Sequence, residues 1–421
     1  MISNNRKTIS KAGLPLCTIF VVSTISIFFN PYEIFGSTYT NIGIIIVYLA
    51  CLLYGLIAAK SSISKYQINL FILLFLILFL NFRNALVMSS VGLLSLTVLL
   101  KKEVFFPIIL VDLIHSFITL YFIYDFLGKG NLLPLGELYV LPGQTDPNFS
   151  SYTLFLYFLF SVRIKSLLGT LFAIYLGLLS LSRAYSLSIF SFLILFAILP
   201  FFLKNHFFNK ITRKFSSIFS FLPDRKRLLF VYIVLFANLL IYAYGSVLSS
   251  TLEGNSVSRF DIERLYTISS GDDHRFIANQ AYAEYFLKNP EVLLRGDASL
   301  SIDTKYTGGL TVPHNGLIFE TILLGFPFLI VYLIILSSIL SKFDYYSNLA
   351  FIITPFIFSL FLHTGFSINQ NIFVFCLISM ANNTHKQFWL INIPFASFIF
   401  ILLPRRAISS PRELKDRKIS G

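Results

Sequence analysis

Arginine and histidine residues gather around one polar stretch of the sequence, and both residue types can do chemistry. Residues 249–313 include Arg259, Arg264 and Arg275, and His314 follows them directly. An arginine guanidinium is a planar, permanently charged donor that suits the binding of anions. A histidine, with an ordinary pKa of about 6.5, can exchange a proton near neutral pH. These residues predict an anion-binding site with a candidate acid or base beside it.

The sequence alone leaves simpler roles open for the same residues. Arg275 follows Asp272 and Asp273, with which it could form an exposed ion pair of small energetic weight. His314 precedes Asn315 at an expected helix start, where it could act as a capping residue. The arginines earlier in the stretch could be ordinary loop charges.

Long apolar blocks flank the polar stretch, and they predict the elements that position it. The chain has 421 residues, of which 56% are hydrophobic and 13% are charged. Soluble domains have about 25% charged residues, whereas a helix that crosses a bilayer needs roughly 20 mostly apolar residues. We therefore expect an all-α, polytopic integral membrane protein with one long outer-face (periplasmic) segment.

The chain has a formal net charge of +13, and most of its basic residues cluster in short gaps between the apolar blocks. Examples are Lys101 and Lys102, Arg163 and Lys165, and the stretch 204–227, whereas the acidic residues fall in the other gaps. This positive-inside pattern orients the spans, with the N-terminus inside, and does not indicate nucleic acid as a partner. About twelve spans are expected. They are 13–29, 41–59, 67–82, 85–100, 104–127, 147–162, 167–182, 184–203, 228–248, 315–340, 349–364 and 369–383.

This topology divides the chain into four regions. They are an N-terminal transmembrane bundle of about nine spans (1–248), a periplasmic segment (249–314), C-terminal transmembrane helices (315–404) and a basic cytoplasmic tail (405–421). A further apolar run over 388–403 has an open topology. Cys17, Cys51 and Cys376 lie inside apolar blocks and are interpreted as small hydrophobic residues.

The polar stretch also contains a helical pattern. Phe276, Ala283, Phe286 and Leu287 are spaced as a core-facing set, and the pattern ends at Asn289-Pro290. A long ordered segment of this kind is usually functional. Its aromatic residues are interpreted as core rather than as a platform for stacking sugars.

Several short motifs occur in a fixed order along this part of the chain. They are His274-Arg275-Phe276, Lys288-Asn289-Pro290, Gly296, Pro313-His314-Asn315-Gly316, Leu324-Gly325-Phe326-Pro327 and, earlier, Ser182-Arg183. In this order they resemble the signature shared by O-antigen polymerases of the Wzy type and O-antigen ligases. The number and order of the expected spans fit the same family.

The resemblance implies a glycosyltransferase of the bacterial inner membrane whose active site faces the periplasm. Such an enzyme polymerises oligosaccharide repeat units linked to undecaprenyl pyrophosphate and needs no nucleotide or other cofactor. Arg183 and Arg275 are then candidate catalytic ligands of the pyrophosphate, which cations stabilise as a leaving group. His314 is then the candidate base, or orienting group, for the acceptor hydroxyl.

Further residues near these motifs are candidates for contact with the substrate. The substrate-binding candidates are Arg259, Arg264, Asn315 and Glu320, of which Glu320 is also an alternative base. The expected partners are the lipid-linked oligosaccharide and membrane lipid, and a chain-length regulator protein is a candidate partner. No metal site is expected, because His274 with Asp272 and Asp273 lacks a recognisable ligand spacing.

Two other functions fit the sequence. An O-antigen ligase moves the same donor onto lipid A–core and shares the His-Asn motif. A polysaccharide flippase belongs to another class, in which charged residues usually line a central path.

Asp112 and His115 lie one turn apart inside an expected span, and such a pair is either a functional site or a hydrogen-bonded packing pair.

Overall fold

The structure, a computed structural model, describes most of the expected helices. The described residues are 13–59, 84–100, 108–128, 140–141, 147–180, 182–197, 274–297, 315–340, 345–359 and 368–380. Within these ranges every regular element is a helix and there is no strand, so the all-α prediction is confirmed there. The spans predicted at 67–82 and 228–248, and the run 388–403, lie outside the described residues.

The described helices are α1 (Gly13–Phe28), α2 (Pro31–Phe35), α3 (Ser37–Ala59), α5 (Asn84–Leu99), α6 (Ile108–Gly128), α7 (Pro147–Arg163), α8 (Leu167–Leu179), α9 (Arg183–Ala197), α14 (His274–Lys288), α15 (Pro290–Arg295), α16 (Gly316–Leu324), α17 (Phe326–Leu340), α18 (Tyr345–Ser359) and α19 (Ile368–Met380). Apart from α2, α14 and α15, the helices begin and end close to the predicted apolar blocks. The block predicted as one span over 315–340 is two helices, because Gly325 has a φ of +80° that ends α16.

Length and composition single out two of the described helices as able to cross a membrane. They are Ser37–Ile57, within α3, and Leu110–Gly128, within α6. Shorter apolar stretches occupy α1, α8, α9 and α19.

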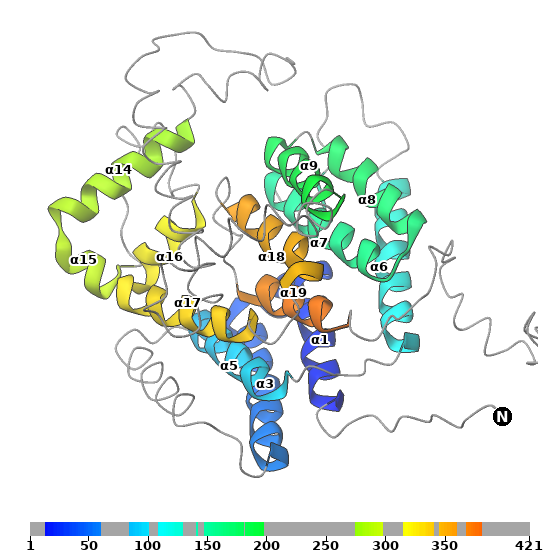
Figure 1. Cartoon of the computed structure of the whole chain (residues 1–421), viewed down its shortest axis with the longest axis horizontal. Coiled ribbons are helices and arrows are strands. Elements are labelled where there is room, and N and C mark those ends of the chain that lie inside the picture. The colour runs from blue at the N-terminus through cyan, green and yellow to red at the C-terminus, as the bar shows by residue number, and fades with distance from the viewer. Residues whose placement is uncertain are drawn as a thin grey trace, which may run out of the picture.

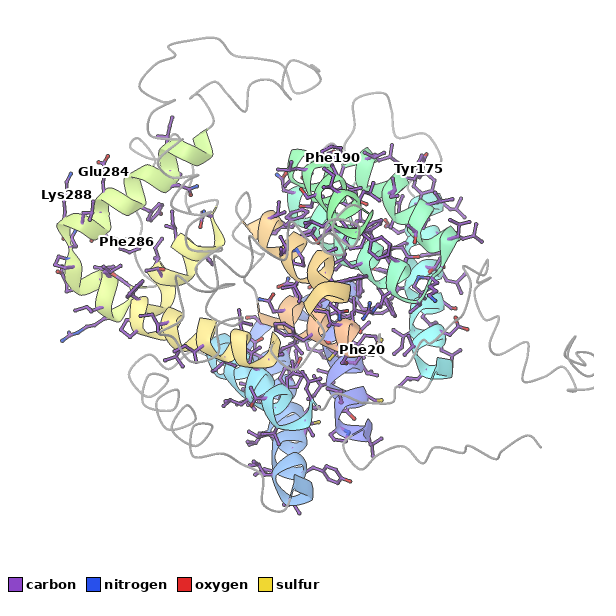
Figure 2. The ribbon with its side chains drawn as sticks, viewed as in Figure 1. Phe20, Tyr175, Phe190, Glu284, Phe286 and Lys288 are labelled. Carbon is purple, nitrogen blue, oxygen red and sulfur yellow. The ribbon has the colours of Figure 1, made fainter. Side chains whose placement is uncertain are left out.

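The core lies around α7, whose residues 151–162 are buried on every side. A helix that is buried on all sides lies at the centre of its bundle. Phe160 of α7 and Phe20 of α1 both pack on Phe373 of α19, with ring centroids 5.8 Å and 5.7 Å apart. Phe20 lies inside the molecule in Figure 2, whereas Tyr175 and Phe190 lie on its surface.

Figure 1 shows the arrangement of the helices, with α1, α3 and α5 packed on one another and α5 also in contact with α17 and α19. Helices α6 to α9 pack together beside α18 and α19, while α14 and α15 lie at the periphery against α16 and α17. The cysteines Cys17, Cys51 and Cys376 are buried and free, as their apolar surroundings predict.

Candidate functional site

The structure describes the predicted site residues to different extents. His314, Arg259 and Arg264 lie outside the described residues. Arg275 is the second residue of α14 and Arg183 is the first residue of α9, so both stand at helix starts, as the motifs predict. Their roles stay predictions. Glu320 occupies the middle of α16, and Asn315 immediately precedes that helix.

Asn315 is the N-cap of α16. Its side chain is buried, and its Oδ1 accepts a hydrogen bond from the backbone N–H of Ile318 at 3.2 Å. An asparagine at this position satisfies one of the four backbone donors that a helix start leaves unpaired. The capping role considered for His314 therefore belongs to Asn315, and it fixes where the chain enters α16.

Helix α14 packs against α15 and α16 through a small apolar cluster. Tyr282, Phe286, Val292 and Ile322 are its buried members, and each is at most 9% exposed. The predicted helix ending at Asn289-Pro290 is confirmed, and its aromatic residue Tyr282 is core. The assignment of Leu287 to that core is wrong, because Leu287 is 81% exposed.

The two helices that carry the arginine and histidine motifs begin on the same side. In Figure 1 the first turns of α14 and α16 face the rest of the molecule, and both helices run outward toward α15 and α17. In Figure 2, Phe286 points from α14 toward α16, whereas Glu284 and Lys288 point away. The helical period places position 275 in line with Tyr282 and Phe286. The structure thus brings the helix opened by Arg275 against the helix headed by Asn315.

Two glycines allow α15 to close onto the junction of α16 and α17. Gly296 ends α15 with a φ of +72°. The next residue, Asp297, donates its backbone N–H to the carbonyl oxygen of Ile322 at 2.6 Å. At Gly325, a Cβ atom would lie 2.5 Å from the carbonyl oxygen of Leu294. Both the left-handed conformation and the close approach require glycine at position 325.

Replacing Gly325 with alanine is expected to destabilise the protein by about 2–4 kcal/mol, from the strained φ together with the backbone clash. Thermal unfolding of the purified protein in detergent measures this effect. Gly43→Ala is the matched control, because nothing lies within 4 Å of a Cβ at Gly43. Equal melting temperatures for the two variants would contradict the close packing of α15 on this junction.

The Ser182-Arg183 motif lies at the turn between α8 and α9. Ser182 is buried, and its hydroxyl donates a hydrogen bond to Asn148 Oδ1 in α7 at 3.2 Å. The hydroxyl of Tyr185 donates to the carbonyl oxygen of Ala173 in α8 at 2.6 Å. These bonds fix the first turn of α9, and with it the backbone of Arg183, against α7 and α8.

The contacts of Arg163 were not predicted from the sequence, because a basic residue in a short gap between apolar blocks was interpreted only as a topology signal. Its Nε donates to the carbonyl oxygen of Leu377 at 3.0 Å. Its Nη2 donates to the carbonyl oxygen of Ile378 at 2.9 Å and to Asn348 Oδ1 at 2.8 Å. The guanidinium carbon also lies 4.8 Å from the centroid of the Phe351 ring. Arg163 therefore joins the ends of α7, α18 and α19.

The pair Asp112 and His115 lies inside a packed cluster. Both side chains are buried, and His115 Nε2 lies 2.9 Å from Ser161 Oγ. The imidazole stacks on the ring of Tyr157, with centroids 5.3 Å apart. At Gly169 of α8, a Cβ atom would lie 2.7 Å from His115 Nε2. The contacts of His115 favour the packing interpretation over a separate functional site.

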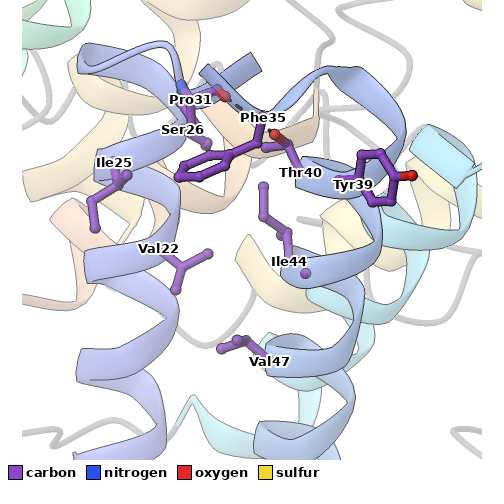
Figure 3. A pocket seen from close by; sticks show the side chains of 10 residues that line it. Val22, Ile25, Ser26, Pro31, Phe35, Tyr39, Thr40, Ile44 and Val47 are labelled. Atoms are coloured by element: carbon purple, nitrogen blue, oxygen red, sulfur yellow. Dashed lines mark hydrogen bonds between the residues drawn. The ribbon is translucent and has the colours of Figure 1, made fainter. Parts of the chain in front are cut away.

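A groove lies between α1, α2 and α3, with a volume of about 410 Å³ (Figure 3). Its lining is mostly aliphatic and aromatic, and its polar side-chain groups are the hydroxyls of Ser26, Tyr39 and Thr40. Thr40 donates a hydrogen bond to the carbonyl oxygen of Pro31 at 3.3 Å, which is drawn in Figure 3. None of the lining residues is charged, so the groove does not suit a pyrophosphate.

Comparison with known proteins does not extend the assignment. No family model, no curated protein and no solved structure matches the chain. The function proposed below rests on the residues and on the packing of α14 against α16.

Proposed function

We propose that the protein is a membrane glycosyltransferase that polymerises oligosaccharide repeat units carried on undecaprenyl pyrophosphate. The packing of α14 on α16 carries this proposal, since it sets a helix opened by Arg275 beside a helix capped by Asn315 directly after His314. A cation for the pyrophosphate and a base for the acceptor hydroxyl are the two groups that the reaction needs.

We also propose the arrangement of about twelve spans that the charge pattern predicts. The hydrogen bonds of Arg163 support it, because they join helix ends that the pattern assigns to the cytoplasmic side. The bond between Ser182 and Asn148 supports it in the same way on the outer side. Helix α16, with His314 before it, then starts at the outer surface, where lipid pyrophosphate lies.

Reporter fusions test this topology. Alkaline phosphatase, which is active only outside the cytoplasm, is expected to be active when it is fused after Gly128. Green fluorescent protein, which fluoresces only inside, is expected to fluoresce when it is fused after Lys165. Phosphatase activity at Lys165, or fluorescence at Gly128, would contradict the orientation of α6 and α7.

The reaction balances without a further reagent. The oxygen of the acceptor hydroxyl forms a bond to the anomeric carbon of the donor sugar, and His314 accepts the hydroxyl proton. The bond between that carbon and the pyrophosphate oxygen breaks, and undecaprenyl pyrophosphate leaves. Arg275 and Arg183 stabilise the charge on the leaving group, with Arg259 and Arg264 as further contacts to the donor phosphate. Asn315 and Glu320 are candidate contacts to other parts of the substrate. The dipoles of α9 and α16 also favour anions at the N-terminal ends of these two helices, next to Arg183 and His314 in the sequence.

Deletion of the gene, with analysis of the surface polysaccharide on a gel, tests the proposed function in the cell. A lipid core that bears a single repeat unit, with no ladder of longer chains, is the expected result. A core with no unit, together with lipid-linked polymer outside, would instead indicate a ligase. Lipid-linked units trapped on the cytoplasmic face would indicate a flippase.

A further inference from the structure

The side chain of Asn279 is buried within α14 without a partner for its oxygen. The residue is 5% exposed, and within the part of the chain that the structure describes its Oδ1 accepts no hydrogen bond. Buried polar atoms in folded proteins nearly always have a partner, and an exception calls for an explanation such as a bound ligand. The orphaned oxygen belongs to the same helix as Arg275.

The position of Asn279 relates it to the candidate site. It follows Arg275 by four residues and precedes Tyr282 by three, so the three positions lie on one face of α14. Tyr282 is packed in the cluster with Ile322 of α16, which shows that this face is turned toward α16. Asn279 therefore lies between the apolar contact of the two helices and their first turns.

We propose that Asn279 Oδ1 accepts a hydrogen bond from a hydroxyl of the donor sugar that is joined to pyrophosphate. Four residues of a helix span about 6 Å along its axis, which is about the width of one sugar ring. A pyrophosphate held at the level of Arg275 would place its first sugar at the level of Asn279. A buried amide oxygen that is paired only in the complex discriminates well between a sugar with that hydroxyl and one without it. This inference rests on the proposed function.

The test compares wild-type protein with Asn279→Leu in proteoliposomes, using lipid pyrophosphate donors that each lack one hydroxyl on the first sugar. Wild-type protein is expected to lose about tenfold in kcat/KM with one of these donors. Asn279→Leu is expected to lose about tenfold with the complete donor and to lose nothing further with that particular deoxy donor. Lys288→Gln, an exposed change at the end of α14, is the matched control for both measurements.

Three results would overturn the inference. First, the kcat/KM of Asn279→Leu could equal that of wild type with the complete donor. Second, the kcat/KM of Asn279→Leu could fall below that of wild type by the same factor with the complete donor and with every deoxy donor. A shift in the pH profile of kcat/KM with equal losses for all donors would instead assign Asn279 to orienting His314. Thermal unfolding separates these outcomes from misfolding, because removing a buried unpaired oxygen should leave the melting temperature of Asn279→Leu unchanged or raised. If the wild-type protein joins no units at all, the proposed function fails, and the inference falls with it.

Discussion

Replacing His314 with alanine is expected to slow polymerisation by about 10²–10⁴-fold, the usual contribution of a general base. The expectation follows from the cap of α16. Asn315, which immediately precedes this helix, accepts a hydrogen bond from the backbone of Ile318, so the capping role does not fall to its neighbour in the sequence, His314. The rate of chain elongation in membranes, followed on a gel, measures the effect. His206→Ala is the matched control, since His206 lies in a stretch expected on the cytoplasmic side.

A polymer of normal length and rate in the His314→Ala variant would rule out the histidine as base. The alternative base, Glu320, would then be replaced by glutamine.

The Arg275→Lys variant tests the binding of the pyrophosphate at the same site, because lysine keeps the charge but loses the planar fork that binds phosphate oxygens. We expect Arg275→Lys to bind the lipid pyrophosphate more weakly than wild type while His314→Ala binds it normally.

Replacing Arg163 with methionine is expected to give the largest loss of stability, about 3–5 kcal/mol. Three neutral acceptors lose hydrogen bonds from a charged donor, each worth about 1.5–3 kcal/mol, and the recovered cost of burying the guanidinium offsets part of that loss. The change leaves the carbonyl oxygens of Leu377 and Ile378, at the end of α19, without the guanidinium that caps them. It also removes the bond to Asn348 that holds α18. Thermal unfolding in detergent and the yield of folded protein measure the loss.

Arg163→Lys should recover part of that stability, because an ammonium can pair with one carbonyl but cannot span all three acceptors. Lys288→Met is the matched control, since Lys288 is exposed and its replacement should change stability by no more than about 0.5 kcal/mol. If Arg163→Met melts at the wild-type temperature, the connection between α7, α18 and α19 contributes nothing to the fold.

The helices that lie in apolar blocks could be predicted well from the sequence, and α14 from its helical spacing, whereas the short helices α2 and α15 lie outside those blocks and were not predicted. The prediction of one span over 315–340 was wrong, because Gly325, with its φ of +80°, divides the block into two helices without any change of polarity along the sequence. Leu287 was assigned to the core from its spacing in the helical pattern, but the packed face of α14 runs through Tyr282 and Phe286 and excludes Leu287. A difference of one residue turns a helical position by about 100°, which is enough to expose it.

The candidate site was accessible to sequence reasoning only where residue type and local motif coincide. Arg275 and Asn315 were identified because each stands at a helix start within a recognisable motif, and the structure places both there. Arg163 gave no such signal, because its partners lie more than 180 residues away in the chain. Asn279 was missed for a different reason: an amide inside a helical pattern is ordinary until its burial and lack of a partner are known.

The most direct test of the proposed function uses purified protein in proteoliposomes, supplied with lipid pyrophosphate-linked repeat units as both donor and acceptor. The proposal predicts a ladder of products that grows by one repeat unit at a time, with release of one undecaprenyl pyrophosphate for each unit joined. It also predicts that His314→Ala forms no ladder while it still binds the donor. Movement of intact units across the bilayer, with no bond formed between them, would contradict the proposal and indicate a transporter.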